Sequence, residues 1–170
     1  GMESLSSSKT IRNAEDFKNW KFRSPPGLAT TVFANLGASP IVMDFTEIFT
    51  ALETGIIDGA DASNIATNVS LGLYDIVKHT NYPGFHSMPS DHLACNKAIW
   101  DGMPEGHRRI ISVAMESLAF KTSMQVGKGM TAAASKLASE GVTLHDWSPE
   151  DPASFRAAAQ AAWADFATTP

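Results

Sequence analysis

The chain has 170 residues, of which 44% are hydrophobic, and its 18 acidic residues outnumber its 13 basic residues to give a formal net charge of -5. A chain of this length can bury one core, which predicts a single domain or one lobe of a larger protein. Because no run of lysine and arginine could face nucleic acid or anionic lipid, the composition argues against nucleic-acid binding. The single cysteine, Cys95, excludes an internal disulfide, and no apolar stretch approaches the roughly 20 residues that span a bilayer.

Residues 1–12 have the polar composition of an N-terminal extension that precedes a domain. Gly1 before Met2 is typical of a scar from tag removal, and the polar residues after it have neither the basic nor the apolar region of an export signal. We therefore expect residues 1–12 to lie outside the fold and residues 13–170 to form it.

The next segment alternates between helix and strand patterns. A short helix is expected over residues 13–20 and a strand over 21–23, which a turn rich in proline ends. Apolar residues at helical spacing predict a helix over residues 28–36, with Gly37 at the position of a C-terminal cap, and a strand over 39–43 follows.

The same alternation continues after this strand. Asp44 and Glu47 have the spacing of a capping box, which predicts a helix that ends at Gly55. A strand over residues 56–62 then leads into the small polar residues 63–68, which would leave the carboxyl end of that strand open to a ligand. Strands that alternate with helices predict an α/β architecture in two or three layers, with a mixed sheet.

The second half is expected to be mainly helical. A strand is predicted over residues 91–96, and Pro104 then opens a helix that extends to Leu137 and should be the longest of the chain. A last strand over 142–147 precedes a terminal amphipathic helix that begins near Ser148. The sequence has no internal repeat.

Four motifs in this order resemble the solute-binding proteins of tripartite ATP-independent periplasmic (TRAP) transporters. They are Lys21-Phe22-Arg23, Leu36-Gly37-Ala38-Ser39-Pro40, the run from Phe49 to Gly55 with Asp58-Gly59 after it, and the run from Asn96 to Pro104. Residues 82–86 extend the match, and Phe49 stands where the family more often has tyrosine.

The resemblance covers residues 14–164 and corresponds to the second half of a family member. It implies a periplasmic-binding-protein-like lobe with a mixed sheet and long C-terminal helices, without the segment that builds the first lobe. In the family two lobes close on the ligand about a hinge, so this chain would hold the second lobe and the helices that cross the hinge. The implied function is that of a periplasmic receptor that delivers a small organic carboxylate to TRAP membrane subunits.

Arg23 is the residue that the resemblance assigns to the ligand. The family's arginine on the Lys-aliphatic-Arg strand grips the substrate carboxylate, and a guanidinium offers a planar pair of donors that matches a carboxylate. The alternative is a surface arginine in an ordinary ion pair, since charged side chains mostly lie outside.

Asp61 occupies an acidic position after the Asp-Gly strand. Some relatives use this position to hold a cation that bridges to the ligand, and a hard carboxylate suits Na⁺ or Ca²⁺, so Asp61 is a candidate for both ligand and metal contact. The segment Asp61-Ala62-Ser63-Asn64 departs from the family's commoner forms. Asp61 could instead cap a helix that starts near Asn64, because aspartate is a preferred N-cap.

Further candidates lie in two loops. Phe85 and His86 fall in the segment that crosses between lobes, where relatives present an aromatic wall and a polar contact, although a lone histidine is more often structural. Asn64 is a candidate polar contact, as are Ser63 and Asn68 more weakly, because asparagine and serine also gather in ordinary loops.

Two other classes of function were weighed against receptor activity. An enzyme is not expected, because no Gly-x-Ser-x-Gly elbow or His-Glu-x-x-His spacing accompanies the histidines. A non-binding remnant, or an interaction module that forms a homodimer, remains open, since the terminal helix carries Phe155, Trp163 and Phe166 and an exposed apolar helix commonly marks a partner surface.

Overall fold

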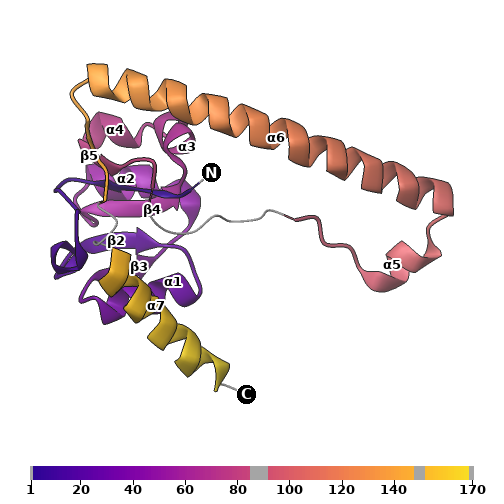
Figure 1. Ribbon diagram of the computed structural model, residues 1–170, viewed down its shortest axis with the longest axis horizontal. Helices are drawn as coiled ribbons and strands as arrows, with labels where there is room; N and C mark the ends of the chain where they lie inside the picture. The colour runs from indigo at the N-terminus through magenta and orange to yellow at the C-terminus, as the bar shows by residue number, and fades with distance from the viewer. Residues whose placement is uncertain (1, 85–91, 148–151, 169–170) are drawn as a thin grey trace.

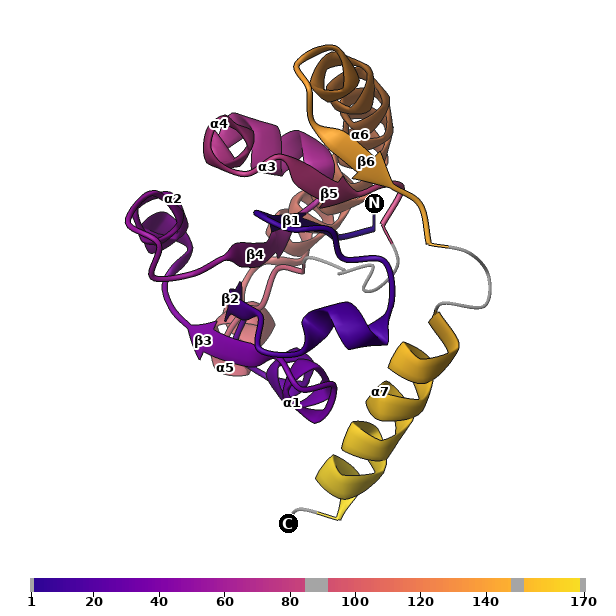
Figure 2. The same ribbon diagram turned by 90° about the vertical axis from the view of Figure 1, so that its left-hand side faces the viewer.

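The computed structural model describes residues 2–84, 92–147 and 152–168. Their centre is one six-stranded sheet with the strand order β3-β2-β4-β1-β5-β6, and helices cover both of its faces (Figure 1, Figure 2). The α/β architecture with a mixed sheet that the sequence predicts is therefore confirmed, and of the two or three layers expected it has three. The strands are β1 (Ser4–Ser7), β2 (Lys21–Ser24), β3 (Ser39–Val42), β4 (Gly59–Ser63), β5 (His79–Asn81) and β6 (Thr143–His145).

Strand direction decides which residues meet at the edge of the sheet. β2 runs parallel to β3 and to β4, with Phe22 opposite both Pro40 and Gly59, and β1 is antiparallel to β4 and β5. β6 is parallel to β5. The carboxyl ends of β2, β3 and β4 consequently lie side by side.

The structure corrects the expectation that residues 1–12 lie outside the fold. Ser4 to Ser7 form β1, whose four residues are all buried between β4 and β5. The polar sequence does not predict a buried strand, yet two of its serines have hydrogen-bond partners: the Ser6 Oγ accepts a bond of 3.2 Å from the Asn68 Nδ2, and the Ser7 Oγ accepts one of 3.1 Å from the Lys9 backbone nitrogen. The described fold thus includes the segment that the composition assigned to an N-terminal extension.

An aliphatic core covers one face of the sheet. The short helices α2 (Ile48–Glu53), α3 (Ile65–Ser70) and α4 (Leu73–Ile76) lie on this face together with the end of α6. Their buried side chains include Ile48, Leu52, Ile65, Leu73 and Leu137. Burial of each such side chain stabilises the fold by about 1.5–3 kcal/mol.

An aromatic core covers the opposite face. The 3₁₀ helix η1 (Ala14–Phe17), α1 (Leu28–Asn35) and α7 (Pro152–Ala167) pack there, on the other side of the sheet in Figure 2. The rings of Trp20 and Phe22 stack at 4.5 Å between centroids, and this core also contains Phe17, Phe33, Trp147 and Phe155. It fixes β2 against η1 and α1, and so fixes the strand that carries Arg23.

The predicted helix signals hold at the turn after β3. The Asp44 side chain accepts from the backbone of Thr46 while the Glu47 side chain accepts from the backbone of Asp44, and this capping box opens the 3₁₀ helix η2 (Phe45–Glu47) that leads into α2. The chain therefore turns from β3 into helix immediately at the sheet edge.

The predicted turn between α1 and β3 also forms. Gly37, after α1, has a φ of 87°, which a residue without Cβ adopts readily.

The helix α6 (Glu105–Ser139) is the longest described, as predicted, with 35 residues. Only its last part packs on the body, through Met130, Ala133, Ala134 and Leu137, while the rest stands away from the sheet (Figure 1). Ile110 is 67% exposed and Phe120 is 68% exposed on this outer part. Among the described helices, none combines the length and the apolar character needed to cross a membrane.

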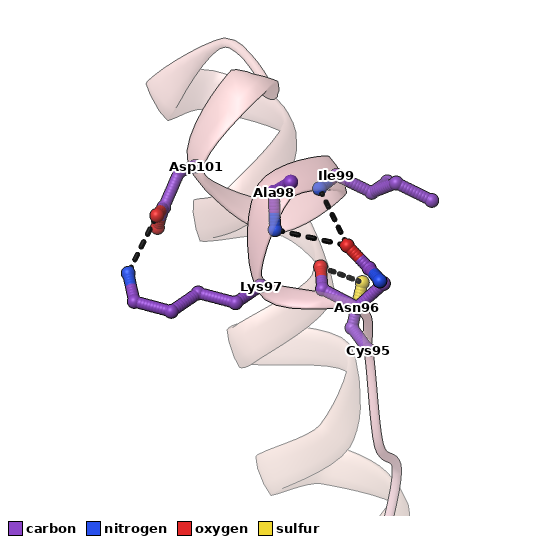
Figure 3. Close-up of polar contacts among 6 residues, drawn as sticks. All are labelled: Cys95, Asn96, Lys97, Ala98, Ile99 and Asp101. Atoms are coloured by element: carbon purple, nitrogen blue, oxygen red, sulfur yellow. Dashed lines mark hydrogen bonds and ion pairs between the residues drawn. The ribbon is translucent and has the colours of Figure 1, made fainter.

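The strand expected over residues 91–96 is not formed in the part of it that the structure describes. Residues 92–96 form no strand and are exposed, because they lie away from the sheet and have no neighbouring strand to pair with, and Asp91 lies outside the described residues. The helix α5 (Lys97–Gly102) follows, and Figure 3 shows the Asn96 Oδ1 accepting from the backbone nitrogens of Ala98 and Ile99. An exposed ion pair between Lys97 and Asp101 spans one turn of α5.

Candidate functional site

The candidate site lies where β2, β3 and β4 end. In α/β sheets this carboxyl edge is open because the chain turns away from it into helices, and ligands bind there. Arg23 is on β2 and Asp61 is on β4, and the turn that holds Asp44 and Phe45 follows β3. The topology brings together four residues that are up to 38 positions apart in the chain.

One backbone carbonyl of β4 and one of the residue directly after β3 hold Arg23. Its Nη1 donates to the Asp61 carbonyl at 2.6 Å, and its Nε donates to the Met43 carbonyl at 3.4 Å. The guanidinium carbon lies 5.7 Å from the centre of the Phe45 ring, within reach of a cation–π interaction. With 6% of its surface exposed, Arg23 is not the ordinary surface arginine of the alternative interpretation.

The negative charges of three carboxylates act on this guanidinium. Burial lowers the pKa of Arg23, and the negative charges of Asp61, Glu3 and Asp44 raise it. Hydrogen bonds from the hydroxyl and the backbone of Thr46 lower the pKa of Asp44, and the charge of Arg23 lowers it further. Asp44 is therefore ionised at neutral pH.

Asp61 is a strand residue and not a helix cap. It lies opposite Leu5 of β1 and is 1% exposed, and its carbonyl oxygen binds Arg23. The cap of α3 is Asn64, whose Oδ1 accepts from the backbone of Ala66 at 3.1 Å and of Thr67 at 3.2 Å. The alternative, that Asp61 caps a helix starting near Asn64, is wrong, because the strand continues to Ser63 and the helix begins one residue after Asn64.

The other predicted contacts divide into three groups. Asn64 and Ser63 lie at the carboxyl end of β4, as expected, although the Asn64 Oδ1 is occupied by the cap. Asn68 is fully buried and donates to the Ser4 carbonyl at 2.9 Å, which is a structural role. Phe85 and His86 lie outside the described residues, and their contact with a ligand stays a prediction.

The predicted cation finds little support in the described chain. The described residues contain no group of three or more His, Cys, Asp or Glu side chains that could hold a metal ion. Ca²⁺ takes six to eight oxygen ligands, and a cation beside Asp61 would also lie close to the positive charge of Arg23. The described residues do not build a cation site by themselves, and the bridging role of Asp61 stays a prediction.

Phe45 and Asp44 lie at the candidate site, and the sequence interpretation missed both. Asp44 was assigned only to a capping box and Phe45 was given no role, and Phe45 is 37% exposed beside Arg23. The signal that could have found them is their position directly after the β3 strand, because this places them at the same open edge as Arg23.

Comparison with known proteins gives the family. The family model described as "Bacterial extracellular solute-binding protein, family 7" matches residues 1–169. The chain belongs to this family. Family 7 proteins are periplasmic solute receptors and not enzymes, and the TRAP resemblance of the sequence motifs is confirmed.

Two curated relatives illustrate the range of ligands named for similar proteins. The sialic acid-binding periplasmic protein SiaP of Vibrio cholerae is 28% identical over 170 residues, which cover 98% of this chain and 50% of SiaP. The C4-dicarboxylate-binding periplasmic protein DctP of Rhodobacter capsulatus is 30% identical over 118 residues, which cover 68% of this chain and 34% of that protein.

Similarity to a solved structure confirms the fold. The apo open structure of a TRAP periplasmic solute-binding protein from Rhodobacter sphaeroides is 34% identical and has a TM-score of 0.79. The match covers 100% of this chain and 54% of that protein. The chain thus spans about half the length of the relatives that it matches.

Proposed function

We propose that this chain is the arginine-bearing part of a periplasmic receptor that binds small organic carboxylates and passes them to the membrane subunits of a TRAP transporter. The observation that carries the proposal is Arg23, a buried guanidinium held at the carboxyl edge of three parallel strands. The family supplies the context of a small-solute receptor, and the carboxylate and the transporter are the finer steps proposed for this chain.

The geometry of Arg23 suits a carboxylate for two reasons. Two of its N–H donors bind backbone carbonyls, which fixes the plane of the guanidinium, and the remaining donors can form the paired hydrogen bonds that a carboxylate accepts. Because the group is already desolvated, an incoming carboxylate does not have to remove water from both partners.

The chain by itself should bind carboxylates weakly. One lobe leaves the ligand partly hydrated, so we expect a Kd in the millimolar range, which corresponds to about 4 kcal/mol of binding free energy. Nuclear magnetic resonance titration with butyrate should shift the Arg23 Nε–Hε signal in a saturable way. If the signal does not move at butyrate concentrations up to about 100-fold above a Kd of about 1 mM, the proposed function is contradicted. A submicromolar Kd would contradict the expectation that the chain by itself binds weakly.

A second candidate function, self-association, is favoured by the exposed face of α6. Ile110, Val113, Phe120 and Met124 follow one another at spacings of three, seven and four residues, which places them on one side of the helix. Trp163 and Phe166 of α7 are a second exposed apolar pair. An exposed apolar helix face is commonly covered by a partner, and the partner proposed here is a second copy of this chain.

We therefore expect a dimer or a larger assembly at micromolar concentration, as measured by light scattering. Phe120→Glu places a charge in the apolar stripe and should shift the chain towards the monomer. Thr122→Glu changes an exposed residue on another side of α6 and is the control. A monomer for the unmodified chain, or equal assembly of both variants, would contradict the prediction.

A further inference from the structure

The environment of Arg23 contains more negative than positive charge. Asp61, Glu3 and Asp44 all act on its guanidinium. Backbone geometry independently supports this placement for two of them. Ser4 of β1 lies opposite Ser63 of β4, so Glu3 is at the carboxyl end of β4, and Asp61 directly provides the carbonyl that binds Arg23.

Asp44 is the carboxylate most accessible to a ligand. The residues on both sides of it touch Arg23, since the Met43 carbonyl accepts from Nε and the Phe45 ring faces the guanidinium, so Asp44 lies between two Arg23 contacts. Asp44 is exposed, and both of its hydrogen bonds from Thr46 go to Oδ1, at 2.9 Å and 2.7 Å. The Asp44 side chain also accepts from the Glu47 backbone in the capping box. A carboxylate has about four lone-pair sites, so acceptor capacity is left for an incoming donor.

Glu47 adds a further negative charge to the same turn. Its Oε2 accepts from the Asp44 backbone nitrogen at 3.0 Å, and this bond holds the glutamate beside Asp44. A ligand that is anionic at both ends would place its second carboxylate among these groups. A ligand that carries a cation at its far end would find acceptors there.

We propose that the site prefers zwitterionic carboxylates, with the carboxylate on Arg23 and an ammonium group on Asp44, over dicarboxylates. This inference rests on the proposed function, since it assigns the substrate class of the same site. The competing way to balance the charge is a metal cation that accompanies an anionic ligand. The described residues favour the zwitterion because they provide no metal-binding cluster.

Three ligands of equal chain length separate these choices. Butyrate, 4-aminobutyrate and succinate share one carboxylate and differ at the far end, which is a methyl group, an ammonium or a second carboxylate. Exposed charge pairs contribute about 0.2–1 kcal/mol each, and exchanging a repulsion for an attraction counts twice, so 4-aminobutyrate should bind about twofold to 30-fold more tightly than succinate. Butyrate should lie between them. The measurement is the same resonance titration of the whole chain, in a buffer that contains a metal chelator.

Asp44→Asn tests the residue that the inference names. This variant should lose most of the preference for 4-aminobutyrate over succinate while it retains binding of butyrate through Arg23. Asp75→Asn removes the same charge from an exposed position on α4 and should leave the order of the three ligands unchanged.

The outcomes distinguish this inference from the proposed function. If none of the three ligands shifts the Arg23 signal, the proposed function fails and the inference fails with it. If butyrate binds but succinate equals or exceeds 4-aminobutyrate, only the zwitterion preference is wrong. Tight binding of succinate that appears only after addition of Ca²⁺ would also overturn it, in favour of a bridging cation.

Discussion

Gly59→Ala is expected to destabilise the chain by about 3 kcal/mol or more, at the upper end of what overpacking usually costs. An added Cβ at this position would lie 2.3 Å from the Trp20 Cζ2 and 2.5 Å from the Ser6 carbonyl oxygen. Neither neighbour can move easily, because Trp20 is stacked on Phe22 in the aromatic core and Ser6 belongs to the central strand β1. A loss of this size is a large share of the roughly 5–15 kcal/mol that stabilises a typical domain.

Urea unfolding followed by tryptophan fluorescence measures this effect, and Gly127→Ala is the matched control. Gly127 lies in the exposed middle of α6 with no atom within 4 Å of the added Cβ. Alanine there should stabilise the helix by about 0.5–1 kcal/mol. If the Gly59→Ala variant unfolds at the same urea concentration as the unmodified chain, the prediction that Trp20 packs too closely on β4 to admit a Cβ is contradicted.

Arg23→Lys is expected to have the largest effect on binding. In a cleft completed by an opposing lobe, loss of one partner from a buried charge pair costs about 2–5 kcal/mol of binding free energy. Lysine keeps the charge but cannot make two parallel hydrogen bonds to one carboxylate. In this chain alone the ligand stays hydrated, and the loss should be nearer the roughly 0–1 kcal/mol of an exposed pair.

Isothermal calorimetry on the chain joined to a first lobe measures the affinity of the Arg23→Lys variant. Arg109→Lys, at an exposed position of α6, is the control and should bind like the unmodified protein. Urea unfolding of both variants separates a lost ligand contact from a lost fold, since Arg23 also binds the carbonyls of Met43 and Asp61. Unchanged affinity in a folded Arg23→Lys variant would place Arg23 outside the site.

The sequence predicts those parts of the fold that depend on neighbouring residues. The capping box of Asp44 and Glu47, the turn at Gly37 and the long helix after Pro104 are all confirmed, because each depends on contacts within a few residues. β1 was missed because a strand of mostly serine residues is buried only when distant partners supply its hydrogen bonds. The strand expected over residues 91–96 failed in the described part for the opposite reason, since no partner strand reaches it.

The candidate site was predictable to a similar extent. Arg23 and Asp61 could be assigned to one sheet edge, because parallel strands end together. The burial of Asp61 and the approach of Phe45 to the guanidinium depend on how three strands pack. Such packing follows from the whole fold and is not encoded in any local motif.

The central position of β1 has a consequence for the order of folding. Ser6 pairs with Ala60 on one side and Thr80 on the other, so β1 must wait for partners that follow it much later in the chain. Closing such long loops is entropically slow, whereas α6 can form from local contacts alone. Until β1 inserts, β4 and β5 each present an open strand edge, and an open edge is a template for pairing with another chain. The stage just before β1 inserts is therefore when this protein is most exposed to misassembly.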